Sequence, residues 1–305
     1  MDSLLKPFNP KKAAFGRHET FALRYAWLTK GFQAFEKNDA IFSKEEATIE
    51  LGVGKNMVNA IKYWLRATNM LEDTEQGLIA SEIGKAIFSE DGYDPYLEDE
   101  ATLWVCHWLL ATNFELATAW YWFFNCFHKS EFTSEEAADA LADFVRNNLG
   151  KHSERTVKQE IPMILRMYSP AKAQIEDSLD APLTSLNLIM AVDGSHLYRS
   201  FSSQQANLPI DVIGYASNEM FNQRQVEVLP ISDLMYGQKY ACALGSVFRL
   251  TESALLAKLE NLVKKYPVDF RLDETAGIHQ LSRINNSKSS LDFLHHYYQA
   301  QTVVV

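Results

Sequence analysis

Residues 43–88 read SKEEATIELGVGKNMVNAIKYWLRATNMLEDTEQGLIASEIGKAIF, and this stretch decides the fold expected for the first part of the chain. Ser43 is followed three positions later by Glu46, which fits a capping box and predicts a short helix. The residues Gly52-Val53-Gly54 predict a tight turn, because glycine accepts the left-handed backbone that such turns need. A second helix is then expected over residues 55–69.

The remainder of this stretch predicts a small hairpin. Residues 71–80 have the pattern of two strands joined at Gly77, and residues 83–88 of a short helix. Helix, glycine turn, helix and hairpin together predict a winged helix-turn-helix, a fold that often binds DNA.

The helix expected over residues 55–69 divides into a polar face and an apolar face. Lys55, Asn59, Lys62 and Arg66 are spaced by four, three and four, so they share one face. Bases are read by Asn and Arg, while Lys and Arg hold phosphates. The predicted contacts with double-stranded DNA are Lys55, Asn56, Asn59, Lys62, Tyr63 and Arg66. The alternative is a solvated face on a winged domain that binds protein.

Beyond residue 92 we expect further helices, so the predicted fold class is mainly α with small β wings. The predicted domains are residues 1–92, 93–180 and 181–305. Residues 208–215 and 225–231 look like strands in the C-terminal domain. A first helix is also expected within residues 15–31, with Thr20 as its cap and Gly31 as its end.

A second helix-turn-helix-like unit is expected over residues 133–168. Thr133 opens one helix, which ends before Gly150, and Ser153 opens the next. The basic residues Lys151, Arg155 and Lys158 lie at this second opening, and they are candidates for a further DNA contact. An ordinary charged surface is the alternative.

Composition limits the class of protein. The chain has 305 residues and a formal net charge of −10, so any DNA contact must come from a local basic face. Three cysteines, none in a C-x-x-C pair, argue against a disulfide framework and a cysteine zinc site. The apolar run 103–127 is interrupted by His107, Asn113 and Glu115, which favours two buried helices over a membrane span. A cytoplasmic protein without membrane contact is expected.

Few patterns point to catalysis. His18 and Glu19 are adjacent at an expected helix start, where a His–Glu pair could do acid–base work, although a capping Glu is the commoner use. Asp269, Asp273 and Glu274 offer three carboxylates that could hold a divalent ion, although such clusters are usually solvated. There is no P-loop, no dinucleotide-binding glycine motif and no familiar nuclease motif in the sequence.

Four blocks of sequence resemble the SspB family, which is encoded beside bacterial DNA phosphorothioation genes. They are HETFALRYAWLTKG at 18–31, LGVGKNMVNAIKYWLRATNML at 51–71, DPYLEDEATLWVCHWLLATNFELATAWYWFFN at 94–125 and FRLDETAGIHQL at 270–281. The resemblance covers nearly the whole chain. It implies a role in sulfur modification of the DNA backbone for antiphage defence. The partners that it implies are a cysteine desulfurase, an ATPase and a sulfurtransferase.

The resemblance also implies that the protein nicks one DNA strand, and a nickase of this kind would need Mg²⁺ or Mn²⁺. His18, Glu19 and Arg24 lie in the first block and are the leading catalytic candidates; Asp273 and Glu274 are the second set. The alternative is a winged-helix adaptor without catalysis, which recruits the sulfur-transfer ATPase machinery to its DNA site. A homodimer is left open.

Overall fold

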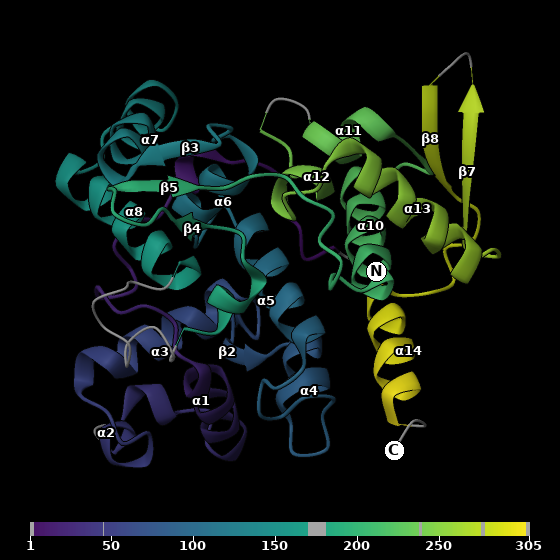
Figure 1. Ribbon diagram of the computed structural model, residues 1–305. Coiled ribbons are helices and arrows are strands. Elements are labelled where there is room, and N and C mark those ends of the chain that lie inside the picture. The colour runs from purple at the N-terminus through teal and green to yellow at the C-terminus, as the bar shows by residue number, and fades with distance from the viewer. Residues whose placement is uncertain (1–2, 45, 170–180, 238–239, 276–277, 303–305) are drawn as a thin grey trace. The chain divides into compact units, whose positions relative to one another are not determined.

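The computed structural model of the chain (Figure 1) describes residues 3–44, 46–169, 181–237, 240–275 and 278–302. It divides into two units. The larger unit is Asn9–Phe123 with Phe127–Phe201, and the smaller unit is Met1–Phe8, Phe124–Cys126 and Ser202–Val305. Helices predominate in both units and the sheets are small, so the predicted class, mainly α with some β, is confirmed.

The larger unit starts with a 3-10 turn at Pro10–Lys12, and its first α-helix is α1, Tyr25–Lys37. The predicted helix over residues 15–31 is therefore wrong at both ends. Glu19 and Thr20 have φ angles of 51° and 64°, which a right-handed helix does not accept. Gly31 lies inside α1 and does not end it. A Cβ at this position would be 2.5 Å from Cγ2 of Ile61, so the glycine permits close packing of α1 against α3.

Residues 41–88 contain the elements predicted for them, in the predicted order. They are α2 (Ala47–Glu50), α3 (Lys55–Ala67), the antiparallel strands β1 (Leu71–Thr74) and β2 (Gly77–Ala80), and α4 (Glu82–Phe88). A 3-10 turn at Ile41–Ser43, which was not predicted, precedes them. Gly52 has a φ of 66° in the turn before α3, as predicted. The capping box at Ser43 is wrong, because Ser43 ends the 3-10 turn and no side chain caps α2.

The apolar run forms two helices, α5 (Glu100–Thr112) and α6 (Thr118–Asn125), as predicted. Every residue of α5 after Glu100 is buried, which explains why its sequence is apolar on all sides. No helix in the described part of the chain is both long and apolar enough to cross a membrane.

The next two helices of the larger unit follow their predicted caps. They are α7 (Ser134–Asn148) and α8 (Glu154–Tyr168). Thr133 and Glu136 form a full capping box on α7, and the Ser153 hydroxyl accepts a hydrogen bond from the Thr156 amide at the start of α8.

A three-stranded antiparallel sheet completes the larger unit, in the order β3-β5-β4. Its strands are β3 (Glu131–Thr133), β4 (Met190–Ala191) and β5 (Leu197–Arg199), and a 3-10 helix at Pro182–Leu186 precedes β4. Phe132 pairs with Tyr198, so residues 190–199 belong with the segment that starts at 131. The two units therefore do not follow the predicted boundaries at 92/93 and 180/181; residue 180 itself lies outside the described residues.

The smaller unit combines helices with the antiparallel sheet β6-β8-β7. Its elements are α10 (Ile210–Arg224), β6 (Val228–Pro230), α11 (Ile231–Tyr236), α12 (Leu244–Val247), α13 (Glu252–Lys265), β7 (Phe270–Thr275), β8 (Ile278–Arg283) and α14 (Ser290–Thr302). The predicted strand at 208–215 is wrong, because this stretch enters α10. Residues 211–221 are all buried, so a helix there shows no alternation of polar and apolar faces. The predicted strand at 225–231 is confirmed in part by β6.

Candidate functional site

The polar face predicted for α3 is exposed in the structure. Lys55, Asn56 and Asn59 are exposed, and Lys62 is partly exposed. Neither lysine forms an ion pair with another described residue. We call the four residues the α3 surface; it is basic and lies at the start of a helix that follows a glycine turn.

Arg66, on the same face, is already engaged by a carboxylate. Its Nε donates to Oδ2 of Asp73 over 2.9 Å, and its Nη2 contacts the same oxygen. Asp73 lies on β1, so the pair joins the last turn of α3 to the hairpin. A contact with a DNA base or phosphate would have to use the remaining N–H groups of Arg66 or displace this carboxylate.

Tyr63 does not lie on the exposed face. Its side chain is buried, and its hydroxyl donates to the backbone oxygen of Leu116 over 3.0 Å. Burial, together with the nearby Glu160 carboxylate, raises the pKa of Tyr63 well above its usual value. The position of Tyr63 disagrees with the predicted DNA contact, because the hydroxyl is used inside the core.

The second predicted basic group separates into exposed and paired residues. Lys151 and Arg155 are exposed on either side of the Ser153 cap. Lys158 lies 2.8 Å from Asp139 and 3.0 Å from Glu154, and these hydrogen bonds raise its pKa. Lys158 therefore already has carboxylate partners, whereas Lys151 and Arg155 form no ion pair with a described residue.

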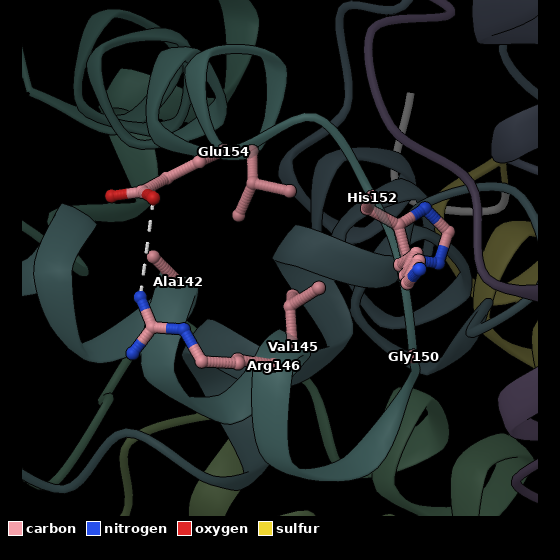
Figure 2. Close-up of a pocket in the computed structure, with 8 residues that line it drawn as sticks. Ala142, Val145, Arg146, Gly150, His152 and Glu154 are labelled. Carbon is pink, nitrogen blue, oxygen red and sulfur yellow. Dashed lines mark ion pairs between the residues drawn. The ribbon is translucent and has the colours of Figure 1, made fainter.

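A cavity of about 340 Å³ lies beside this group, between α7 and α8 (Figure 2). Its lining consists of Ala142, Val145, Arg146, Gly150, Lys151, His152, Glu154 and Val157. Arg146 and Glu154 lie 4.0 Å apart across it. Apolar side chains and cations therefore share one opening.

His18, the leading catalytic candidate, is buried against a distant carboxylate. Its Nε2 lies 3.4 Å from Oε2 of Glu160 on α8, and both side chains are 2% exposed. Its Nδ1 accepts a hydrogen bond from the amide of Thr20 over 3.1 Å. Nδ1 therefore uses its lone pair in this bond, whereas Nε2 lies near Glu160 without forming a hydrogen bond to any described residue.

Three aromatic rings enclose this pair. The His18 ring stacks on Trp64 with centroids 6.0 Å apart, and Tyr63 and Trp120 meet it edge-on at 6.1 and 5.9 Å. Glu160 also accepts a hydrogen bond from the amide of Gly16. A phosphodiester cannot reach either nitrogen of His18 in this conformation, so the pair ties the segment around residues 16–20 to α8.

The other candidates of the first block lie elsewhere. Glu19 is exposed, in the turn with positive φ. Arg24 precedes the first residue of α1, and its guanidinium lies 5.7 Å from the centre of the Trp27 ring. His18 pairs with Glu160 rather than with the adjacent Glu19, because residues 18 and 160 meet only in the folded chain.

The acidic residues at 269–274 do not converge. Asp269 is buried and lies 2.5 Å from the Lys288 ammonium. Asp273 accepts hydrogen bonds from Arg271 over 2.8 Å and from the Ser282 hydroxyl over 3.1 Å, and the Arg271 bond contributes most to lowering its pKa. Glu274 follows Asp273 on β7, so the two side chains face opposite sides of the sheet.

The described residues do not fit the metal site expected from these carboxylates. Within that part of the chain, no group of three or more His, Cys, Asp or Glu side chains could hold a metal ion.

Comparison with known proteins identifies the chain's relatives. A family model described as "Protein of unknown function (DUF4007)" matches residues 15–298. The chain belongs to this family. No curated protein sequence matches it.

Two solved structures share the family fold seen here. The one described as "Magnesium ion-bound SspB crystal structure" is 27% identical, with a TM-score of 0.83, over 96% of this chain and 91% of that one. The one described as "SspB crystal structure" is 28% identical, with a TM-score of 0.82, over 95% and 90%. The resemblance to SspB indicated by the four sequence blocks is confirmed.

Sequence reasoning missed Glu160 as the partner of His18, and it missed the cavity. One signal for Glu160 was available. Val157, Ile161 and Ile164 form the apolar face of α8, and Glu160 lies among them. A carboxylate on an apolar helix face needs a buried partner. Nothing in the sequence identifies that partner as His18.

Proposed function

We propose that this protein binds DNA through the α3 surface, as a component of an Ssp-type DNA phosphorothioation system. The observation that carries the proposal is the exposed start of α3, where Lys55, Asn56 and Asn59 lie together beside Lys62. The likeness to SspB structures supports the choice of system.

In this proposal residues 43–88 act as a winged helix-turn-helix. The order of α2, a glycine turn, α3 and the β1–β2 hairpin supports this assignment. The α3 helix would enter the major groove, with Asn56 and Asn59 reading base edges while Lys55 and Lys62 hold phosphates. Since the whole chain carries a net charge of −10, binding would be confined to such local faces.

Strand nicking is the finer proposal, and the resemblance to the SspB family supports it. A nick would open one strand for sulfur insertion by the ATPase, sulfurtransferase and cysteine desulfurase of the system. Glu19 and Arg24 remain accessible for such chemistry. His18 could take part only after the segment around residues 16–20 left Glu160.

The burial of His18 favours a second candidate function, an adaptor that binds its DNA site and recruits the sulfur-transfer ATPase without cutting. In that case the His18–Glu160 pair is purely structural. The two candidates share the α3 surface and differ only in whether a phosphodiester is cleaved.

The test is a supercoiled-plasmid assay with purified protein in Mg²⁺, in Mn²⁺ and in EDTA. Metal-dependent open-circle product, lost in Glu19→Gln or Arg24→Ala while DNA binding persists, supports the nickase. Binding without open-circle product supports the adaptor. Protein that neither binds nor nicks DNA overturns the proposal.

A further inference from the structure

The cavity between α7 and α8 combines an apolar lining with cations at its rim. Ala142 and Val145 of α7 and Val157 of α8 are buried and supply the apolar part. Figure 2 shows Arg146 and Glu154 facing each other across the opening and His152 at another side. Its volume of about 340 Å³ is within the range of ligand sites, roughly 300–1,000 Å³.

The N-terminal segment lies beside the cavity, where Phe15 contacts the lining residue His152. The rings of Phe15 and His152 meet edge-on, with centroids 5.1 Å apart. A Cβ on Gly16 would lie 2.7 Å from Cγ2 of Thr156, so the backbone at Gly16 packs directly against α8. Arg17 follows at once in the chain and is exposed.

The cations of the cavity lining, Arg146 and Lys151, and those at the neighbouring chain positions 17 and 155 differ in whether they are already paired. Arg146 pairs with Asp143 and Glu154, over 2.7 and 4.0 Å. Arg17, Lys151 and Arg155 form no ion pair with another described residue. These three cations are thus available to an anion from outside, and they lie on the larger unit with the cavity.

An apolar cavity beside available cations fits one form of DNA better than another. The phosphates of a duplex need only an open basic face, since the bases are stacked inside. An unpaired nucleotide presents an apolar ring flanked by phosphates, and proteins bind such strands by combining a basic groove with surfaces that take the rings.

We propose that this cavity binds an unpaired nucleotide of DNA, with its base against Ala142, Val145 and Val157 and its phosphates held by Lys151, His152 and Arg155. The inference deepens the DNA-binding proposal and rests on it. The nucleotides next to a nick can separate from the opposite strand. A protein that makes or binds a nick therefore encounters unpaired nucleotides.

Glu154 gives the cavity a hydrogen-bond acceptor. Its carboxylate lies 3.0 Å from Lys158, whose hydrogen bond is the main cause that lowers the pKa of Glu154. The carboxylate therefore stays ionised near neutral pH, and the Lys158 ammonium neutralises its charge without any ligand. It can accept from an N–H on the edge of a base while the phosphates pass on the side of Lys151.

The test compares two labelled single strands of equal length by fluorescence anisotropy with the full chain. One is oligothymidylate, and the other has the same phosphates but no bases. Oligothymidylate is expected to bind about tenfold more tightly, which corresponds to about 1.4 kcal/mol for the buried base. Equal affinity for the two strands overturns the proposal.

Two variants place the binding at the cavity. Ala142→Leu fills the apolar part and should abolish the preference for oligothymidylate without weakening the abasic strand. Lys151 is exposed, so Lys151→Ala leaves the core intact. It should lower the slope of log K against log salt by about 0.7. Lys264→Ala removes the same charge from an exposed position of α13 and should leave the slope unchanged. A slope unchanged in Lys151→Ala overturns the assignment even if Ala142→Leu fails to fold.

Failure of this inference is distinguishable from failure of the α3 proposal. Lys62→Ala should weaken intact duplex while single-strand binding persists. Lys151→Ala should weaken the single strand while intact duplex binding persists. A protein that binds the single strand but no duplex overturns the α3 proposal alone, and a protein that binds only duplex overturns the inference alone.

Discussion

Nε2 of His18 lies 3.4 Å from Oε2 of Glu160, and both side chains are 2% exposed although 142 positions separate them. Glu160 accepts from the amide of Gly16 as well. One oxygen of this buried carboxylate is therefore hydrogen-bonded to the segment around residues 16–20, and the other lies against the His18 ring of the same segment.

Glu160→Ala should destabilise the protein by about 3 kcal/mol, because it leaves His18 and the Gly16 amide without their buried partner. Urea unfolding followed by tryptophan fluorescence measures the change. Glu154→Ala, on the exposed side of the same helix, is the matched control and should change stability little. Equal stability in the two variants would contradict a structural role for the His18–Glu160 pair.

Asp73→Asn should strengthen DNA binding by releasing Arg66 from its carboxylate partner. If Arg66 then reaches a phosphate, the slope of log K against log salt becomes steeper by about one. Glu75→Gln removes the same charge from the β1–β2 turn without touching Arg66, and it is the control. If both variants raise affinity equally, only the general charge matters and the Arg66–Asp73 pair has no special effect.

Lys62→Ala should reduce the salt slope for duplex DNA by about one if its ammonium contacts a phosphate. Lys85→Ala, on α4 of the same unit, gives the matched loss of one exposed positive charge. Titrations at several salt concentrations give the two slopes. An unchanged slope in Lys62→Ala places the phosphate contact elsewhere.

Tyr63→Phe should lower the free energy of unfolding by about 1 kcal/mol and leave DNA binding intact. The buried hydroxyl donates to the partly buried Leu116 carbonyl, so its removal leaves that acceptor unpaired. Thermal unfolding and anisotropy measured on the same sample separate the two effects. Weaker DNA binding at full stability would restore the predicted contact of Tyr63 with DNA.

Cys106, which is buried, and Cys126, which is half-buried, should resist alkylation in the folded protein. Burial raises the pKa of Cys126 to about 12 and raises that of Cys106 further. Only the thiolate reacts, so at pH 8 both should stay unmodified until denaturant is added. In the unfolded chain the thiols ionise near their usual pKa of about 8.5, whereas in the folded protein they stay protonated. Their contribution to stability is therefore fully present below about pH 8.5 and decreases as the pH rises above that value. Rapid labelling of native Cys106 would contradict its burial.

Local sequence was sufficient for elements whose signals lie within a few residues. The Thr133–Glu136 capping box, the Ser153 cap and the glycine turn before α3 are such signals, and the structure contains each of them. The polar face of α3 follows from helical spacing alone, and Lys55 and Asn59 are exposed as that spacing predicts.

Local sequence failed where burial is uniform or where backbone strain intervenes. The α10 helix is buried from Asp211 to Phe221, so its polar and apolar residues do not alternate with a helical period. The positive φ angles at Glu19 and Thr20 are held by surrounding contacts, including the bond from the Thr20 amide to His18.

The sequence by itself determined the mainly helical class, the basic face of α3 and the resemblance to SspB, because each depends on neighbouring residues or on whole blocks of chain. Only the tertiary structure decided that His18 faces Glu160, that Tyr63 lies inside and that Arg66 meets Asp73. It alone brought Phe15 beside His152 at the cavity rim. The partner of a buried side chain depends on packing between distant segments, and the local periodicity of the sequence does not predict that packing.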